Sequence, residues 1–321
     1  MPKEDSISVI VTAYKRKNYL EESLRSLERQ TLHKDKFEVI LITNFEFNIS
    51  GYKLNIKAIV MEGTIGEFLQ RGILECNNDR ICFLDDDDLF HPQKLQILLD
   101  NFGAEYTYFK NSYKMFTDSN DSFEEIPSFK ADVVYSSNLV KRYSHVYDTN
   151  LSSISIRKSV VNGFINILPG IKTCQDNFFY LCFIRQKGKG LIAKEALSYY
   201  RIHESTSMAS KTRNSPIFEK HVEWTRLLVT SYEMFYSIFG DDKDIGVFLN
   251  SQIIYSRIYL YTLTLDKVDR PNLNLIKFLL HYALFFDTRI LLPKVNFILY
   301  GILPYILPKI GNLLYLHLPN H

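Results

Sequence analysis

The sequence predicts an α/β fold with a mostly parallel central sheet, followed by a helical C-terminal region. Three observations indicate this class. Short apolar runs alternate with amphipathic segments along the first half of the chain, which is typical of parallel strands joined by crossover helices. Four consecutive aspartates, Asp85 to Asp88, directly follow one of these apolar runs. After residue 216 the sequence becomes helical in pattern and increasingly apolar.

Length, charge and cysteine content narrow the functional class. The 321 residues are enough for one large domain or two. A net charge of only +2 excludes the basic footprint of a nucleic-acid-binding protein, so no nucleic acid is expected as a partner. The four cysteines contain no C-x-x-C pair, which argues against a zinc site, and their scarcity fits a reducing compartment. No secretory signal is visible, and a cytoplasmic location is expected.

The first half of the chain indicates four strands and two helices. Residues 7–11 are a β-branched run typical of a strand, and residues 17–30 are amphipathic, with Leu20, Leu24 and Leu27 on one helical face. Further strands are predicted at 37–42, 57–61 and 80–84, and a second helix at 66–76. This alternation implies a parallel sheet with helices on both faces.

The following stretch, up to residue 211, has weaker signals. The expected elements are short aromatic strands within 105–142, a strand leading into a short helix at 152–161, a helix at 173–185, an extended segment at 191–202, and a polar loop at 204–211. Because side chains alternate along an extended segment, Arg201 is expected to point opposite to Ile202 and to be an exterior charge.

The aspartate run indicates a ligand site at the carboxyl edge of the sheet. In sheets of this type the binding crevice lies beyond the carboxyl ends of the strands, where Thr12, Tyr14 and the aspartates are all expected. Four neighbouring carboxylates repel one another, and hard cations such as Mg²⁺ or Mn²⁺ bind such oxygens and hold substrate phosphates. Capping of a helix that starts at His91 and Pro92 is the simpler alternative, but it requires one acid rather than four.

The C-terminal region has two open interpretations. Its uncharged stretches, 278–286 and 295–308, are shorter than the roughly 20 residues that span a bilayer. Their basic flanks and tyrosines suit helices that lie peripherally in a membrane interface, at the cytoplasmic face. The same region, residues 273–318, fits equally well a packed helical subdomain or a homodimer face.

Several short motifs, in order along the chain, resemble those of family 2 glycosyltransferases with the GT-A (nucleotide-diphospho-sugar transferase) fold. The residues that carry the resemblance are Ile7 to Arg16, Leu24-x-Ser26-Leu27-x-x-Gln30-Thr31, Phe83 to Pro92, Cys174 to Asn177, and Tyr200 to His203. Together these motifs cover residues 6–210. The resemblance implies a GT-A catalytic domain at residues 1–215 and a helical region for dimerisation or membrane attachment at 216–321.

The resemblance also implies a function and a set of site residues. The expected enzyme is a metal-dependent, inverting glycosyltransferase that moves a sugar from a nucleoside diphosphate sugar to a saccharide or lipid-linked acceptor, in glycan or polysaccharide assembly. Asp87 is expected to be the direct ligand of Mn²⁺ or Mg²⁺, His203 to complete the metal shell, and Asp176 to be the general base. The residues expected to bind the nucleotide sugar are Thr12, Tyr14, Asn44, Asp85 and Asp86.

This chain departs from the family pattern in ways that leave alternatives open. Thr43 and Asn44 stand where the family has an acidic pair, and Gln175 replaces a glutamate beside Asp176. A sugar-nucleotide-binding protein without catalysis is therefore the alternative function. A nucleotidyltransferase is less well supported, because residues 12–16 contain no glycine for a phosphate loop.

Overall fold

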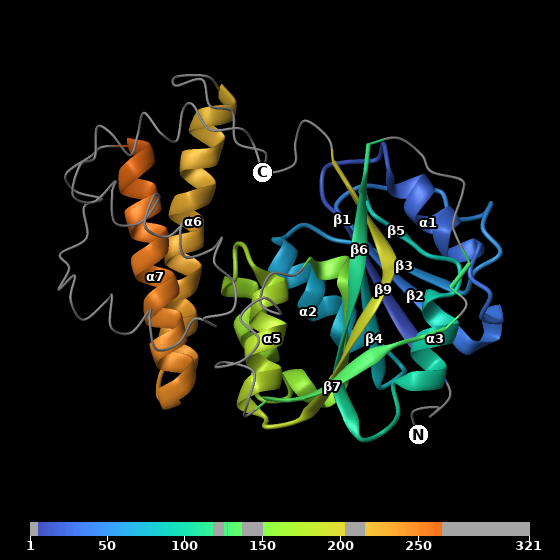
Figure 1. The fold of residues 1–321 in the computed structure, drawn as a ribbon. Helices are drawn as coiled ribbons and strands as arrows, with labels where there is room; N and C mark the ends of the chain where they lie inside the picture. Colours follow the sequence, from blue (N-terminus) through green and yellow to red (C-terminus); the bar gives the residue numbers. More distant parts are fainter. Residues whose placement is uncertain (1–5, 118–124, 127, 137–149, 203–215, 265–321) are drawn as a thin grey trace. The chain divides into compact units, whose positions relative to one another are not determined.

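The computed structural model describes residues 6–117, 125–126, 128–136, 150–202 and 216–264. By their internal contacts the described residues divide into two compact units, one formed by the described residues up to 202 and one by residues 216–264. In the described residues, the first unit is built around a β-sheet and the second around two helices (Figure 1). The domain boundary expected between residues 215 and 216 stays a prediction.

The described part of the first unit forms a nine-stranded sheet in the order β3-β2-β1-β4-β8-β6-β9-β5, with β7 paired to β9. The strands are β1 (Ile7–Ala13), β2 (Phe37–Thr43), β3 (Ile56–Val60), β4 (Arg80–Asp85), β5 (Leu89–Phe90), β6 (Tyr106–Phe116), β7 (Ala131–Tyr135), β8 (Ile154–Arg157) and β9 (Lys189–Arg201). The strands β3, β2, β1 and β4 are parallel to one another, as predicted. Beyond β4 the sheet is mixed, because β8 runs antiparallel to both β4 and β6.

The central strands are buried on both faces of the sheet. Every residue of β1 and β2 is buried, which accounts for their nearly continuous runs of valine, isoleucine and leucine. β1 continues to Ala13, two residues beyond its predicted end, and this extension places Thr12 opposite Asp85 in the parallel register with β4. The carboxyl ends of β1 and β4 therefore lie side by side.

Helices α1 (Leu20–Glu28) and α3 (Lys94–Asn101) cover one face of the sheet (Figure 1). Leu20, Leu24 and Leu27 join the core formed with the odd-numbered residues of β1, so the predicted apolar stripe of the first helix is confirmed. The helix begins at Leu20 rather than Lys17, because Lys15 has a left-handed backbone with φ of 59° and Tyr19 is the N-cap.

Helices α2 (Ile65–Glu75) and α5 (Gln175–Arg185) lie on the opposite face (Figure 1). α2 starts with a capping box, in which Thr64 accepts from the Glu67 N–H and the Glu67 side chain accepts from the Thr64 N–H. α5 packs on the sheet through Phe179, whose ring stacks on Phe83 of β4 with 4.7 Å between centroids.

The second unit contains the antiparallel helices α6 (Pro216–Phe239) and α7 (Lys243–Thr264). Phe218 and Val222 near the start of α6 form a core with Leu260 and Leu263 near the end of α7. The helical pattern predicted after residue 216 is confirmed for these residues. Residues 273–318, on which the membrane and dimer interpretations depend, and the polar loop at 204–211 lie outside the described residues.

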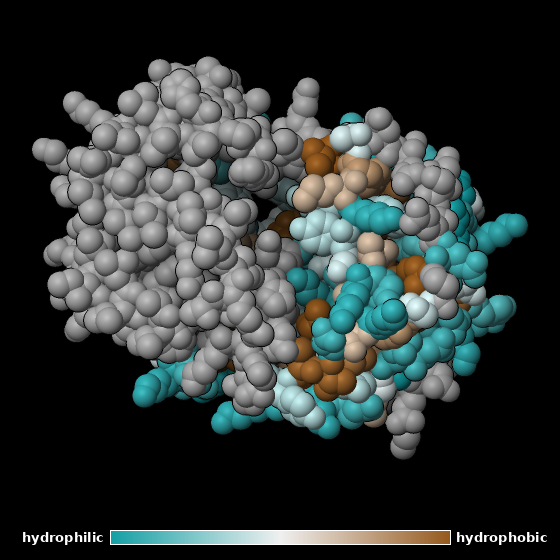
Figure 2. Space-filling model, in the orientation of Figure 1, coloured by the Kyte–Doolittle hydropathy of each residue, from teal (hydrophilic) through white to brown (hydrophobic). Residues whose placement is uncertain are grey.

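Neither α6 nor any other helix in the described ranges is both long and apolar enough to cross a bilayer. Hydrophilic residues cover much of the coloured part of the face shown in Figure 2, with smaller apolar patches between them. The exposed apolar side chains of the described residues include Met115, Leu74 and Tyr135, and single exposed apolar residues of this kind are common on protein surfaces.

The packing of α2 makes a testable prediction about Gly66. A methyl carbon at this position would lie 1.9 Å from the carbonyl oxygen of Leu168, so Gly66→Ala forces backbone atoms apart. We expect a loss of about 1–3 kcal/mol in the free energy of unfolding, and a melting temperature several degrees lower. Gly51→Ala is the control, because a methyl group there meets nothing within 4 Å. Equal melting temperatures for the two variants would contradict this packing.

Candidate active site

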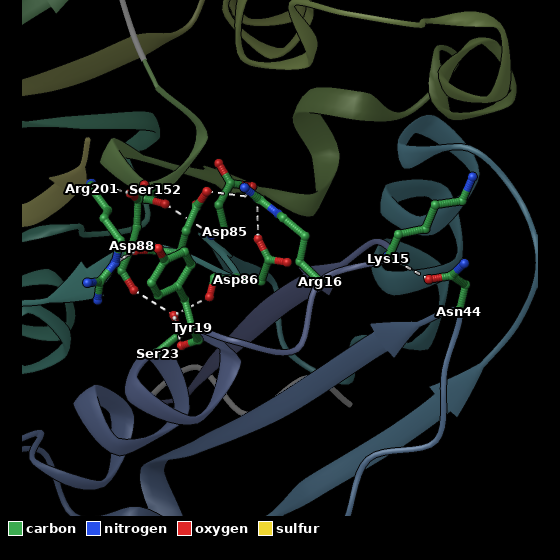
Figure 3. Close-up of polar contacts among 11 residues, drawn as sticks. Lys15, Arg16, Tyr19, Ser23, Asn44, Asp85, Asp86, Asp88, Ser152 and Arg201 are labelled. Carbon is green, nitrogen blue, oxygen red and sulfur yellow. Dashed lines mark hydrogen bonds and ion pairs between the residues drawn. The ribbon is translucent and has the colours of Figure 1, made fainter. Parts of the chain in front are cut away.

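The aspartate run forms a tight turn at the carboxyl end of β4 (Figure 3). The Asp88 N–H donates to the Asp85 carbonyl at 3.3 Å, which closes the turn. Asp86 and Asp88 are 4% and 1% exposed, so their carboxyl groups are held away from water. The prediction that this strand ends at a polar site is therefore confirmed. The aspartate side chains there are more buried than those of a surface helix cap would be.

Burial and mutual repulsion disfavour the charged forms of these carboxylates. Burial raises the pKa of Asp85 well above its ordinary value, and the neighbouring carboxylates add to this rise. Burial raises the pKa of Asp86 to about 7, although Arg16 works in the opposite direction. Burial and the charge of Asp87 also raise the pKa of Asp88 to about 7. The cluster is thus short of positive charge.

Arg16 supplies the nearest cation. Its Nη2 atom lies 2.6 Å from Asp86 Oδ1 and 2.7 Å from Asp87 Oδ2, so one guanidinium nitrogen bridges two carboxylates. Arg16 follows the left-handed residue Lys15, whose backbone N–H donates to Asn44 Oδ1 at 2.8 Å. Although burial works against the charged guanidinium, the two aspartates raise the pKa of Arg16.

Arg201 also reaches the aspartate turn, and the expectation that it is an exterior charge was wrong. It is 2% exposed. Its guanidinium donates to Glu22 Oε2 at 2.7 Å and to the Asp87 carbonyl at 2.8 Å, and its backbone N–H donates to Asp88 Oδ1 at 3.0 Å. The alternation of side chains along one strand could not predict that Arg201 is buried. The direction of its side chain is set by the packing of the end of β9 against the aspartate turn.

Ser152 bonds the aspartate turn directly, and Lys94 in turn bonds Ser152. The sequence analysis predicted a role for neither residue. The Asp85 N–H donates to Ser152 Oγ at 3.0 Å. Lys94 is fully buried, and its Nζ donates to the Ser152 carbonyl at 2.6 Å and to Ser198 Oγ at 2.9 Å. The one available signal for Lys94 was its position four residues before Leu98, which places it on the buried face of α3.

Ser23 of α1, together with Ser26 and Gln30 of the motif that ends the first helix, fixes the same turn. Ser23 Oγ donates to the carbonyls of Asp86 and Asp88, at 2.9 and 2.7 Å. Ser26 Oγ accepts from the Phe90 N–H at 3.1 Å. Gln30 donates to the His91 carbonyl at 2.9 Å and accepts from the Leu95 N–H at 3.0 Å. Ser26 and Gln30 thus position the chain that leaves the aspartates.

Asp176 lies close enough to the aspartate turn for its charge to act there. Its charge is one of those that raise the pKa of Asp85. Asp176 is in the first turn of α5, its Oδ1 accepts from the Asn177 N–H at 2.9 Å, and the N-cap Cys174 has a left-handed φ of 62°. Gln175 does not point to the cluster as a second acid would, because its amide donates to the Ile171 carbonyl at 3.1 Å.

The remaining predicted residues lie around the β1 end. Thr12 is 3% exposed within the sheet. Tyr14 packs edge-on against Phe68, with centroids 5.9 Å apart. Asn44 uses its carbonyl oxygen for Lys15. The predicted roles of these residues in donor binding stay predictions. His203 lies outside the described residues.

The acidic residues fit a hard divalent cation. Within the described ranges, no three His, Cys, Asp or Glu side chains converge on one point as a complete metal site would. Mg²⁺-type ions, however, need one or two carboxylates and take their other ligands from water and substrate phosphates. Asp86 Oδ2 and Asp88 Oδ2 are buried and have no hydrogen-bond partner, so the cluster lacks compensating donors and additional positive charge beside it would stabilise the ionised carboxylates.

The fold, together with a match to a family model, indicates that the protein is a glycosyltransferase. Residues 8–162 match the model of the family described as Glycosyl transferase family 2. Thus the family and the class of enzyme expected from the sequence are confirmed. No curated protein matches the sequence.

Solved structures confirm the GT-A fold. TarS residues 1–349 from S. aureus, in complex with UDP-GlcNAc, has 16% identity and a TM-score of 0.53, with 87% of each chain covered. Mannosyltransferase PcManGT from Pyrobaculum calidifontis, in complex with GDP-Man and Mn²⁺, has 11% identity and a TM-score of 0.55, covering 98% of this chain and 87% of that chain. A longer TarS chain has a TM-score of 0.51, and this protein spans about half of it, 52%.

Lys94 generates a prediction about pH. Burial lowers the pKa of Lys94 to about 7. Between pH 7 and the ordinary pKa of a lysine, the Lys94 amine is therefore protonated in the unfolded chain and neutral in the folded protein. The resulting contribution to stability is lost as the pH falls through this window. Lys94→Met has no such titrating amine. As the pH rises from 7 to 10, the free energy of unfolding of the variant should therefore fall relative to that of wild type, by at most about 1.4 kcal/mol per pH unit.

Urea denaturation at three pH values in this range measures this difference. Lys36→Met is the matched control, since Lys36 is exposed. Parallel pH curves for wild type and Lys94→Met would show that the buried amine stays charged.

Proposed function

We propose that this chain is a metal-dependent, inverting glycosyltransferase whose donor is a nucleoside diphosphate sugar. One observation carries the proposal: buried, under-neutralised carboxylates stand at the carboxyl edge of β4, and Asp176 lies within electrostatic range of them. Nucleotide-sugar donors in the complexes of TarS and PcManGT, and Mn²⁺ in the latter, support the same chemistry.

The donor site that we propose surrounds the ends of β1 and β4. Asp87 would hold Mn²⁺ or Mg²⁺ directly, with Asp86 beside it, and the cation would as a Lewis acid neutralise negative charge on a leaving diphosphate. Tyr14 and Asn44 flank the end of β1 and would contact the nucleotide, while Thr12 and Asp85 face each other in register at the floor of this edge. The hydrogen bonds of Ser23, Ser152 and Arg201 keep the aspartate turn rigid, so the carboxylates need little rearrangement when the donor binds.

Asp176 is the proposed general base. Inversion requires that the acceptor hydroxyl attack the anomeric carbon from the face opposite the leaving diphosphate and lose its proton to a nearby carboxylate. Asp176 is on a different element from the aspartate turn, and its placement at the start of a helix fixes its backbone. The acceptor is a saccharide or a lipid-linked sugar, in glycan or polysaccharide assembly.

Two substitutions test these roles. Asp176→Asn keeps the size of the side chain and its bond to the Asn177 N–H, but removes the base, so transfer should fall at least about a hundredfold while the donor still binds. Asp87→Ala should reduce transfer by a similar factor, and should also abolish Mn²⁺-dependent binding of the donor. Transfer rates with a screened donor, and calorimetry with Mn²⁺, measure both effects.

Asp100→Asn is the control for these variants, because Asp100 is an exposed acid on α3. Circular dichroism establishes that each variant is folded. Wild-type transfer in Asp87→Ala or Asp176→Asn would refute the role assigned to that residue.

For the C-terminal region we propose peripheral attachment at the cytoplasmic face of a membrane. The basic flanks of its short apolar stretches support this. Deletion of residues 272–321 should then release the protein from membrane fractions into the soluble fraction. Free solubility of the full-length chain would contradict attachment, and a change from dimer to monomer on truncation, measured by light scattering, would instead assign these residues to a homodimer face.

A further inference from the structure

We propose that Arg16 is an exchangeable counter-ion of the aspartate turn: it neutralises Asp86 and Asp87 in the free protein, gives way to the divalent cation, and then pairs with the donor's diphosphate. This inference rests on the proposed function and deepens it, since it assigns to the same site an order of charge exchange.

The first step of the argument is that Arg16 and a divalent cation exclude each other. A single nitrogen, Nη2, contacts oxygens of both Asp86 and Asp87, at 2.6 and 2.7 Å. Mg²⁺ binds carboxylate oxygens at about 2.0–2.1 Å. A cation between the same two oxygens would therefore occupy the space of the guanidinium nitrogen, and the two positive charges would repel each other.

The second step is that Arg16 is the partner able to move. The Asp86 and Asp87 side chains are 5% and 13% exposed, whereas the Arg16 side chain is 39% exposed. The backbone that carries the aspartates is fixed by Ser23, which bonds the Asp86 carbonyl, and by Arg201, which bonds the Asp87 carbonyl. Arg16 is instead in the connection between β1 and α1, with a long side chain open to solvent on its outer side.

The third step concerns how Arg16 is aimed. Lys15, the residue before it, has a φ of 59°, a left-handed conformation that is uncommon for a residue with a side chain. The bond from the Lys15 N–H to Asn44 Oδ1, at 2.8 Å, holds this conformation. Asn44 is therefore a positioning residue for Arg16, in addition to any contact that it makes with the nucleotide.

The fourth step is the destination of the released side chain. A guanidinium matches the geometry of phosphate oxygens and forms paired hydrogen bonds with them. Arg16 stands at the carboxyl edge of β1, beside the turn that would bind the cation. When Arg16 moves from the carboxylates to the diphosphate, it remains paired with negative charge. Binding of the nucleotide therefore favours the displaced position of Arg16 and strengthens binding of the cation, and the cation strengthens binding of the nucleotide by the same factor.

The deciding experiment measures the affinity of Mn²⁺ alone for the full-length protein, by electron paramagnetic resonance of free Mn²⁺. Arg16→Gln should bind Mn²⁺ about tenfold more tightly than wild type, the factor expected if the guanidinium covers the carboxylates in roughly nine molecules of ten. Lys17→Gln is the matched control. It removes one positive charge from the same loop, and Lys17 is exposed with its Nζ 4.9 Å from the Phe45 ring centroid, not at the aspartates.

A second variant keeps the inference testable if loss of Arg16 unfolds the protein. Asn44→Ala releases Lys15 and should also tighten Mn²⁺ binding, by a smaller factor. Unchanged or weaker Mn²⁺ binding in both variants would overturn the exchange, and so would equal tightening in Lys17→Gln, which would be a general charge effect.

A further measurement, with UDP and with GDP at saturating Mn²⁺, tests the destination. Arg16→Gln should bind the nucleotide that wild type prefers more weakly, about tenfold for a lost charge-assisted pair. Unchanged nucleotide affinity would leave the exchange intact but overturn pairing with the diphosphate. If Mn²⁺ binds neither to wild type nor to any variant, even in the presence of nucleotide, the metal dependence of the proposed function and this inference both fail. If instead Asp87→Ala abolishes Mn²⁺ binding while Arg16→Gln leaves it unchanged, the inference alone fails.

Discussion

Repulsion among the buried carboxylates at the end of β4 is the constraint on which the rest of this site depends. Three of the four aspartates are raised in pKa by burial and by their neighbours. Groups from the surrounding elements offset part of this cost. Arg16, in the β1–α1 connection, pairs with Asp86. The Arg201 backbone N–H and the Ser152 side chain both bond the Asp88 carboxylate. The site is stable as a turn but incompletely neutralised, which suits a protein that binds a cation with its substrate.

Several residues that carry the resemblance to family 2 glycosyltransferases hold the aspartate turn in place and have no direct part in the proposed chemistry. Ser26 and Gln30 contact no aspartate side chain. They bond the backbone of Phe90, His91 and Leu95, directly after the turn. The motif that ends the first helix therefore links α1 to the residues that follow the aspartate turn. A motif of this kind identifies the architecture, and the catalytic assignment depends on the carboxylates that the architecture holds.

The parallel half of the sheet could be predicted from sequence because β1, β2 and β4 are buried on both faces, and a nearly continuous apolar run is a strong signal. The direction of β8 and β9 could not, since it depends on pairings between residues far apart in the chain. For the same reason Lys94 and Ser152 were missed and Arg201 was misjudged. Their roles come from contacts across 58 and 114 positions of sequence, which a local pattern does not contain.

The anchoring of Arg201 has a consequence for how the protein is made. The aspartate turn is complete by residue 88, yet the arginine that ties Asp87 and Asp88 to Glu22 belongs to the last strand of the sheet. Loop closure over such a span is slow compared with local helix formation. A nascent chain emerging from the ribosome therefore carries all four aspartates long before it can hold them in place. Until β9 is synthesised and docked, the growing chain therefore lacks the arginine contacts that fix Asp87 and Asp88.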